Sequence, residues 1–450
     1  MSRHVHLVGI GGTGLSAIAR VLLERGDQVS GSDQAISPYS EALEQAGARV
    51  VYGHRAENIA GADLVIVSSA VPDTNPEVVA ARKAGLRVVR RNQFLGELTT
   101  GSQTIAVAGT HGKTTTTGLI AWLLDQAGLS PTFIAGGILK DFGTNARAGR
   151  GPHFVIEADE YDRAFLGLTP TVAVVTNVEH DHPDCYPTFD DFRAAFQDFA
   201  ERVQGQLLAC LDDPGAASLQ PSSAQRVTYG LQPAAEWRAE EIRPNAAGGS
   251  DFLVLRGGEL LGLVRTRLPG PHNVVNAVAA LAAVNAVGVP FAEARRAISE
   301  FHGAGRRFEI VGEVGGVWIV DDYAHHPTEI RATLAAARER FPRASVWAVF
   351  QPHTYSRTKT LLDDFAQAFG DANHVIVTDI FASRESPDPT VSSQMLVERM
   401  SHQDVRFIPG LEVAARTLQE RLQAPAVVVT LSAGDGNQVG RLLLQALSEK

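Results

Sequence analysis

The chain has 450 residues and a formal net charge of −10. Its length predicts two or three domains, and its acidic balance excludes the basic patch that a nucleic-acid partner would need. Two cysteines, Cys185 and Cys210, show no metal-ligand spacing, which excludes a disulfide framework and favours a reducing compartment. The N-terminus lacks a signal-peptide pattern, and the longest apolar run, Ala277–Val287, is too short to span a bilayer. We therefore expect a cytoplasmic protein without membrane insertion.

Residues 1–100 alternate short apolar strands with helices, a pattern that predicts a small parallel βαβ sheet. The strand expected at His4–Val8 runs into Gly9-Ile-Gly-Gly-Thr-Gly14, and Asp33 follows about twenty residues later, as in the dinucleotide fingerprint G-x-G-x-x-G. Glycines at such a turn let backbone amides approach a diphosphate at a helix N-terminus. Any nucleotide diphosphate satisfies this chemistry, NAD included.

A second array begins at Thr104 with a phosphate-binding pattern. The apolar strand ending at Ala108 leads into Gly109-Thr-His-Gly-Lys-Thr-Thr115 and then into an apolar helix, which together predict a P-loop. Lys113 would neutralise the outer phosphates, and a threonine hydroxyl would reach Mg²⁺. The first glycine of the standard pattern is replaced by Val107. An oxidoreductase needs no P-loop, so a UDP-linked substrate fits both glycine motifs better than NAD.

Polar residues follow the next strands of this array. Glu157 ends the strand expected at Phe154–Ile156, where doubly wound sheets bind ligands, and is a candidate metal ligand. His180 and His182 follow the strand Val172–Thr176, and spacing alone does not choose between them. Strand-rich sequence over 205–268 includes a hairpin signal at Gly257-Gly258, and an Ala-rich helix starts near His272. Asn273 and Asn276 share one face of that helix and could read an adenine edge.

A third α/β array starts near Gly305. Asp321-Asp-Tyr-Ala-His-His-Pro327 follows the strand Val317–Val320, and Gln351-Pro-His-Thr-Tyr-Ser-Arg357 follows the strand Val346–Phe350. We expect these two strand ends to be adjacent in one sheet, so that their histidines and Arg357 face one cleft.

These segments together resemble the Mur ligases over essentially the whole chain. The motifs that carry the resemblance are Val8-Gly-Ile-Gly-Gly-Thr-Gly14, Gly31-Ser-Asp33, Ser68-Ser-Ala-Val-Pro72, Gly109–Thr115, Glu157-Ala-Asp-Glu160, Asp181-His182, Pro269-Gly-Pro-His-Asn273 with Asn276, Gly305-Arg-Arg-Phe308, Asp321–Pro327 and Gln351-Pro-His353. The resemblance implies an α/β protein of three domains. These are a Rossmann-like UDP-N-acetylmuramate-binding domain (1–100), a P-loop ATP-binding domain (101–304) and a Rossmann-like amino-acid-binding domain (305–450).

The resemblance also implies roles for individual residues. It implies that ATP is bound by Gly109, Thr110, His111, Gly112, Lys113, Thr114, Thr115, His272, Asn273, Asn276, Arg307 and Asp322. It places the UDP-sugar at Gly9, Gly11, Gly12, Thr13, Gly14, Asp33, His54 and Ser69, and the amino acid at Tyr323, His325, His326, His353 and Arg357. Mg²⁺ would be held by Thr114 or Thr115 with Glu157 and with His182 rather than His180. The implied catalytic residues are Lys113, Glu157, His182, His325 and Arg357.

The reaction implied is ATP-dependent ligation of L-alanine to UDP-N-acetylmuramate through an acyl phosphate, an early cytoplasmic step of peptidoglycan synthesis. Two departures bear on it: no lysine occurs at the place near Phe196 where several relatives carry a carbamylated one, and Thr354 stands where some have arginine. The first favours the L-alanine branch. The alternatives are a ligase that attaches a recycled murein tripeptide to the same sugar nucleotide and, more distantly, an NAD-dependent oxidoreductase. We expect small-molecule substrates only, and a monomer or weak homodimer.

Overall fold

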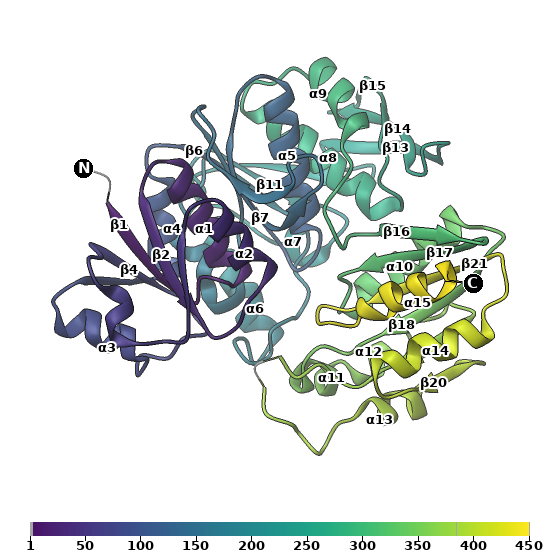
Figure 1. Cartoon of the computed structure of the whole chain (residues 1–450). Helices are drawn as coiled ribbons and strands as arrows, with labels where there is room; N and C mark the ends of the chain where they lie inside the picture. Colours follow the sequence, from purple (N-terminus) through teal and green to yellow (C-terminus); the bar gives the residue numbers. More distant parts are fainter. Residues whose placement is uncertain (1–2, 384, 450) are drawn as a thin grey trace.

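The computed structural model describes residues 3–383 and 385–449, which form three α/β units along the chain (Figure 1). We call them the first, middle and third domains after their separate sheets of five, ten and six strands. The three-domain α/β architecture expected from the sequence is confirmed. The boundaries at 100/101 and 304/305 stay a prediction.

The first domain is a parallel sheet in the order β3-β2-β1-β4-β5. Its strands are β1 His4–Val8, β2 Gln28–Asp33, β3 Arg49–Tyr52, β4 Leu64–Val67 and β5 Arg87–Arg90. Its helices are α1 Thr13–Glu24, α2 Pro38–Gln45, α3 Pro76–Lys83 and α4 Arg91–Thr99, with a 3₁₀ turn at Ala56–Ile59. The chain reverses its direction of winding between β1 and β4, so the glycine turn after β1 lies where such sheets bind nucleotides.

The middle domain is built on the order β15-β14-β13-β12-β11-β10-β6-β9-β7-β8. Its strands are β6 Gln103–Ala108, β7 Thr132–Leu139, β8 Thr144–Arg147, β9 His153–Glu157, β10 Val172–Val175, β11 Gln206–Cys210, β12 Gln225–Gly230, β13 Trp237–Pro244, β14 Ser250–Arg256 and β15 Glu259–Arg265. Its helices are α5 Lys113–Gln126, α6 Phe189–Ala200, α7 Pro214–Ala217, α8 Pro271–Ala286 and α9 Phe291–Ala297, with 3₁₀ turns at Tyr161–Gly167 and Ile298–Glu300. The apolar strands β6, β9 and β10 are buried, which places the P-loop at the centre of the domain.

The third domain has the order β16-β17-β21-β18-β19-β20. Its strands are β16 Glu309–Val314, β17 Val317–Asp322, β18 Ser345–Phe350, β19 His374–Val377, β20 Val405–Phe407 and β21 Ala426–Leu431. Its helices are α10 Pro327–Arg340, α11 Tyr355–Thr360, α12 Leu362–Ala366, α13 Ser393–Arg399, α14 Leu411–Arg421 and α15 Gln438–Ser448. Figure 1 shows it as a green and yellow unit with α10 turned toward the middle domain.

The expected strands and helices of each array are present, and the hairpin at Gly257-Gly258 is confirmed as the antiparallel pair β14–β15. The expectation that the strands ending before Asp321 and Gln351 are adjacent is wrong. The last strand, β21, pairs in parallel with both β17 and β18 and separates them. Strand order depends on contacts between segments far apart in the chain, so the local pattern could not reveal this insertion. None of the described helices has the length and apolar character needed to cross a membrane.

Candidate active site between the three domains

The P-loop joins β6 to α5 and is braced by the segment after β10. Gly112 adopts the left-handed conformation with φ +78°, which favours glycine. Thr110 Oγ1 donates to Glu179 O (2.9 Å), the His111 amide donates to Asn177 Oδ1 (2.8 Å), and Thr176 Oγ1 donates to His111 O (2.6 Å). The loop is thus held in shape by neighbouring polar groups, with helix α5 beginning at Lys113, a setting that suits a phosphate.

The Lys113 side chain is largely enclosed by this loop, with 14% of it exposed. Its Nζ donates to Gly109 O (2.5 Å) and to Glu160 Oε1 (2.9 Å). Burial acts to lower the pKa of Lys113, but the charges of Glu160 and Glu157 outweigh it and raise the pKa, so the ammonium stays charged. Glu160 is only 1 % exposed. Glu160 closes the motif Glu157-Ala-Asp-Glu160, but the sequence pattern predicted no role for it.

Glu157, Thr114 and His182 lie near the Lys113–Glu160 pair. Glu157 Oε2 accepts from the Gly136 amide (2.6 Å); burial raises the pKa of Glu157, although Lys113 opposes this. His182 Nε2 is 3.5 Å from Glu160 Oε1, whereas His180 Nε2 bonds to Tyr186 O (2.9 Å). His182, and not His180, therefore lies beside Glu160, the carboxylate partner of Lys113. A buried carboxylate with a neighbouring hydroxyl is a donor set that suits Mg²⁺.

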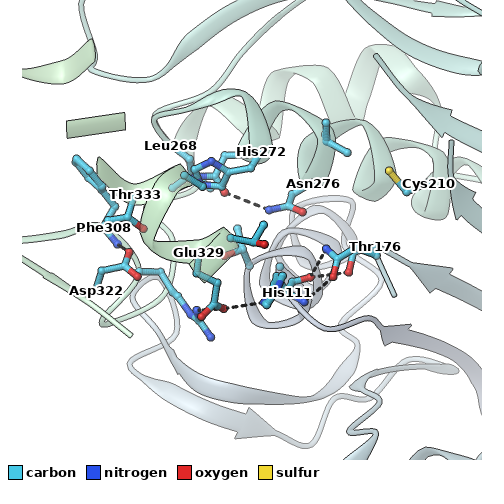
Figure 2. Close-up of a pocket in the computed structure, with 18 of the residues that line it drawn as sticks. His111, Thr176, Cys210, Leu268, His272, Asn276, Phe308, Asp322, Glu329 and Thr333 are labelled. Atoms are coloured by element: carbon cyan, nitrogen blue, oxygen red, sulfur yellow. Dashed lines mark hydrogen bonds and ion pairs between the residues drawn. The ribbon is translucent and has the colours of Figure 1, made fainter. Parts of the chain in front are cut away.

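A cavity of about 290 Å³ opens beside the P-loop, between the middle and third domains (Figure 2). It is lined by His111, Thr115, His272, Asn273, Asn276, Arg307, Phe308, Asp322 and Glu329, among others. The side chain of His272 lines this cavity and is exposed. Asp322 accepts from the amides of Phe308 (2.7 Å) and Ala324 (2.8 Å), and burial raises its pKa to about 6.

The two asparagines of α8 do not point freely into this cavity. Asn276 Nδ2 donates to Asn273 Oδ1 (3.2 Å), and Asn273 Nδ2 donates to Pro269 O (2.7 Å). The side-chain oxygen of Asn276, Oδ1, lies over Gly112. A Cβ atom added to Gly112 would come within 2.7 Å of this oxygen. In this structure Asn276 therefore braces the P-loop as well as lining the cavity.

A second cavity, of about 530 Å³, lies where all three domains meet. It is lined by Thr13, Gly14, Tyr39 and Arg91 from the first domain, Thr114, Glu157 and Asp159 from the middle domain, and Arg306, Arg307 and Tyr323 from the third. Arg91 pairs with Asp159 (2.5 Å) across the first two domains. This cavity connects the start of α1 with Glu157 at the P-loop, a route that the sequence alone did not reveal.

The glycine motif of the first domain is held by a hydrogen bond to the end of β2. Gly9 has φ +88°, and the Gly11 amide donates to Asp33 Oδ2 (2.8 Å). His54 Nδ1 lies 3.0 Å from Ser32 Oγ, while Ser69 is exposed. Asp33 therefore holds the glycine turn in this structure.

The expected amino-acid cluster divides into two groups. The rings of Tyr323 and His325 lie 5.4 Å apart, and those of His325 and His353 lie 5.7 Å apart. Arg357 joins this group, because its Nη1 is 3.0 Å from His353 Nδ1. His326 instead faces His111 of the P-loop at 4.6 Å between ring centroids.

Arg357 has a second partner that sequence reasoning missed. Its Nε and Nη2 donate to Asp181 Oδ1 of the middle domain at 2.9 and 2.7 Å. Thr328 Oγ1 similarly donates to Glu179 Oε2 (2.6 Å) across the same interface. The only local signal was the position of Asp181 beside His182, because the partners of Asp181 and Glu179 lie on distant segments.

The fold and the two cavities define a class of protein: a three-domain enzyme with a P-loop nucleotide site in its middle domain and a second substrate site reaching the same loop. The sequence matches three family descriptions in order: "Mur ligase family, catalytic domain" over residues 4–103, "Mur ligase middle domain" over 107–284 and "Mur ligase, glutamate ligase domain" over 306–434. The chain belongs to the Mur ligase family.

Individual relatives are similar over their whole length. The UDP-N-acetylmuramate–L-alanine ligase of Roseiflexus castenholzii is 44% identical, covering 99% of this chain and 98% of the relative. That of Syntrophotalea carbinolica is also 44% identical, covering 100% and 99%. The crystal structure of UDP-N-acetylmuramate-alanine ligase MurC from Thermotoga maritima superposes with a TM-score of 0.83 at 29% identity, covering 99% of both chains. A murein peptide ligase from Psychrobacter arcticus superposes with a TM-score of 0.73 at 27% identity, covering 100% of this chain and 99% of that one.

Proposed function

We propose that this chain is an ATP-dependent ligase that joins L-alanine to UDP-N-acetylmuramate, a step of peptidoglycan synthesis. One observation carries the proposal: both cavities reach the start of helix α5, since Thr115 lines one and the adjacent Thr114 lines the other together with Glu157. A nucleotide in the first cavity and an acid in the second would meet at Lys113. The family and its L-alanine ligase relatives support this assignment.

In the first half-reaction, the lactoyl carboxylate attacks the γ-phosphorus of ATP, giving an acyl phosphate and ADP. Lys113 stabilises the charge that spreads over the transferring phosphoryl oxygens. Thr114, Glu157 and His182 are the residues that would hold Mg²⁺, which neutralises phosphate oxygens when bound. The first domain would present the UDP-sugar through Gly9–Gly14, with its acid end directed along the second cavity.

In the second half-reaction, the amine of L-alanine attacks the acyl carbon and phosphate leaves. Tyr323, His325, His353 and Arg357 are the candidate amino-acid site. Burial lowers the pKa of His325 well below its usual value, so its neutral imidazole is available to accept the amine proton. Arg357 can hold a carboxylate in a bidentate pair, but it must share its donors with Asp181. The buried interface around these groups would keep water from the acyl phosphate.

The rival within the family is the murein tripeptide ligase, since one such enzyme shares this fold over its full length. The test is release of phosphate by the full chain with ATP, Mg²⁺ and UDP-N-acetylmuramate, varying only the acceptor among L-alanine, glycine, L-serine and the tripeptide. Turnover with L-alanine exceeding that with the tripeptide by tenfold or more is expected. A preference for the tripeptide would overturn the assignment. Calorimetry with NAD should show no binding. Tight binding of NAD would instead favour the oxidoreductase alternative.

The compartment and assembly follow from the same proposal. Both ATP and a UDP-linked sugar are cytoplasmic metabolites, so we place the reaction in the cytoplasm, with a monomer or weak homodimer as the working unit. Its substrates are small molecules.

A further inference from the structure

Two histidines and a glutamate from two domains converge beside the P-loop, outside the Mg²⁺ residues. His111 Nε2 is 3.6 Å from Glu179 Oε2, and His326 Nδ1 is 3.7 Å from the same oxygen. One ligand atom from each of the three residues lies within 4.8 Å of the others. His111 belongs to the loop, Glu179 follows β10, and His326 begins α10 of the third domain.

We propose that His111, Glu179 and His326 form a binding site for a transition-metal dication such as Zn²⁺, which fastens the third domain to the P-loop. Metal–ligand bonds of about 2.0–2.1 Å place neighbouring ligands of a tetrahedral zinc site roughly 3.3 Å apart. The two separations from Glu179 Oε2, 3.6 and 3.7 Å, exceed this by only a few tenths of an ångström, and the two histidine nitrogens lie within 4.8 Å of each other. Two imidazoles and one carboxylate are a common three-ligand set for zinc with an open fourth position.

His111 lies between two carboxylates, one beside each nitrogen of its ring. Neither of its ring nitrogens meets hydrogen-bond geometry with any described residue, although both are buried. Its Nδ1, the nitrogen not directed at Glu179, is 3.2 Å from Glu329 Oε1. A carboxylate behind a histidine is the usual arrangement that orients an imidazole toward zinc and raises its basicity.

Burial acts to lower the pKa of His111, but Glu329 and Glu179 outweigh it and raise the pKa to about 9, so metal binding would release a proton from this imidazole. The other two ligands have no such proton to lose. Burial lowers the pKa of His326 to about 4, so the imidazole is neutral at physiological pH. Its Nδ1 accepts a long hydrogen bond from the Thr328 amide (3.3 Å), which a metal at this nitrogen would displace. Glu179 Oε2 accepts from Thr328 Oγ1 (2.6 Å) and retains a second lone pair for a metal. His111 and Glu179 line the nucleotide cavity, so the fourth position would open to water or a phosphate oxygen there.

This site differs chemically from the Mg²⁺ residues. Mg²⁺ prefers hard oxygen ligands, whereas imidazole nitrogen favours zinc, cobalt or nickel. Excess Mg²⁺ should therefore fill the site at Thr114 and Glu157 and leave this one to the transition metal. Because the ligands come from both sides of a domain interface, bound Zn²⁺ should oppose domain opening and lower turnover.

The test uses the full chain with excess Mg²⁺, titrated with Zn²⁺ in a calorimeter and with Co²⁺ monitored by visible absorption. His326→Asn removes the imidazole but keeps a residue favoured at a helix N-cap. Glu329→Gln removes the supporting charge but keeps the capping-box pattern of α10. We expect His326→Asn to weaken Zn²⁺ binding by more than about 100-fold and Glu329→Gln by about 10–100-fold.

Two controls separate this site from others. His302→Asn changes an exposed histidine paired with Asp141, and should leave Zn²⁺ affinity unchanged. Glu157→Gln disturbs the Mg²⁺ residues and should also leave it unchanged. Failure of the wild-type chain to bind Zn²⁺ under excess Mg²⁺, or equal affinity in wild type and His326→Asn, would overturn the proposal. Loss of binding in Glu157→Gln alone would do so too, because it would place the metal at the Mg²⁺ residues.

Discussion

The ion pair between Asp181 and Arg357 should control how firmly the third domain closes on the middle domain. Both side chains are 5% exposed, and two guanidinium nitrogens contact the same carboxylate oxygen at 2.9 and 2.7 Å. Burial acts to raise the pKa of Asp181, but Arg357 outweighs it and holds the pKa well below its usual value. Removing one partner of a buried pair leaves an uncompensated charge, at a cost of about 3–5 kcal/mol.

The two partners belong to different domains, which decides where this cost appears. Opening the interface returns the orphaned charge to water without unfolding either domain. The penalty should therefore shift the balance between closed and open forms. At about 1.4 kcal/mol per factor of ten, it corresponds to a shift of roughly 100-fold to several thousand-fold. If only the closed form completes the site, kcat/KM should fall by about the same factor while the thermal unfolding temperature changes little.

The measurement is a double-mutant cycle of kcat/KM with Asp181→Asn, Arg357→Gln and the double variant. We expect the double variant to recover much of the loss of either single one, with a coupling energy above about 1.5 kcal/mol. The matched control is Lys140–Glu309, which crosses the same two domains at 3.1 Å but is about one-third exposed. Glu309→Gln should change kcat/KM by less than a few-fold.

Effects of Asp181→Asn and Arg357→Gln that add within about 0.5 kcal/mol would refute the closure argument. A rise in the KM for L-alanine confined to the Arg357 variants would instead show that Arg357 serves mainly the amino acid. Trapping of the acyl phosphate with borohydride separates the two outcomes further. If Arg357 serves only the amino acid, its variants should still form the acyl phosphate.

Three further results are expected. Lys113→Ala should fold normally but lose at least about 10²–10³-fold in phosphate release, since it removes the charge beside the transferring phosphoryl; near-normal turnover would end the P-loop assignment. Glu157→Gln should raise the Mg²⁺ concentration needed for half-activity far more than the KM for UDP-N-acetylmuramate, and an unchanged Mg²⁺ titration would count against a ligand role. Glu77 is fully buried, and although burial opposes it, hydrogen bonds from His6, Ser32 and Asn58 lower its pKa from 4.5 to about 2. This lowered pKa contributes on the order of 3 kcal/mol to the free energy of unfolding above pH 4.5, and the contribution is lost as the pH falls toward 2. Urea unfolding of Glu77→Gln at several pH values should therefore lack that acid dependence. A pH dependence like that of the wild type would contradict this role of Glu77.

The sequence by itself determined the local elements and the chemistry that each one carries. The P-loop, the glycine turn after β1 and the acidic end of β9 are short contiguous patterns in which backbone conformation and ligand preference depend on neighbouring residues. For the same reason the hairpin at Gly257-Gly258 could be predicted from a few residues. The resemblance to the Mur ligases rests on these patterns in their order along the chain.

Tertiary structure alone decided which of these patterns meet. The insertion of β21 between β17 and β18, the pairing of Arg357 with Asp181 and the turning of His326 toward His111 join segments more than 75 residues apart. Such contacts arise from the packing of whole sheets and domains, so no local periodicity encodes them. Likewise, only the structure shows that His182 lies beside Glu160, the carboxylate partner of Lys113, whereas His180 bonds to Tyr186 O. Single motifs thus predicted the chemistry, whereas the partners of each charged group depended on how the three sheets pack together.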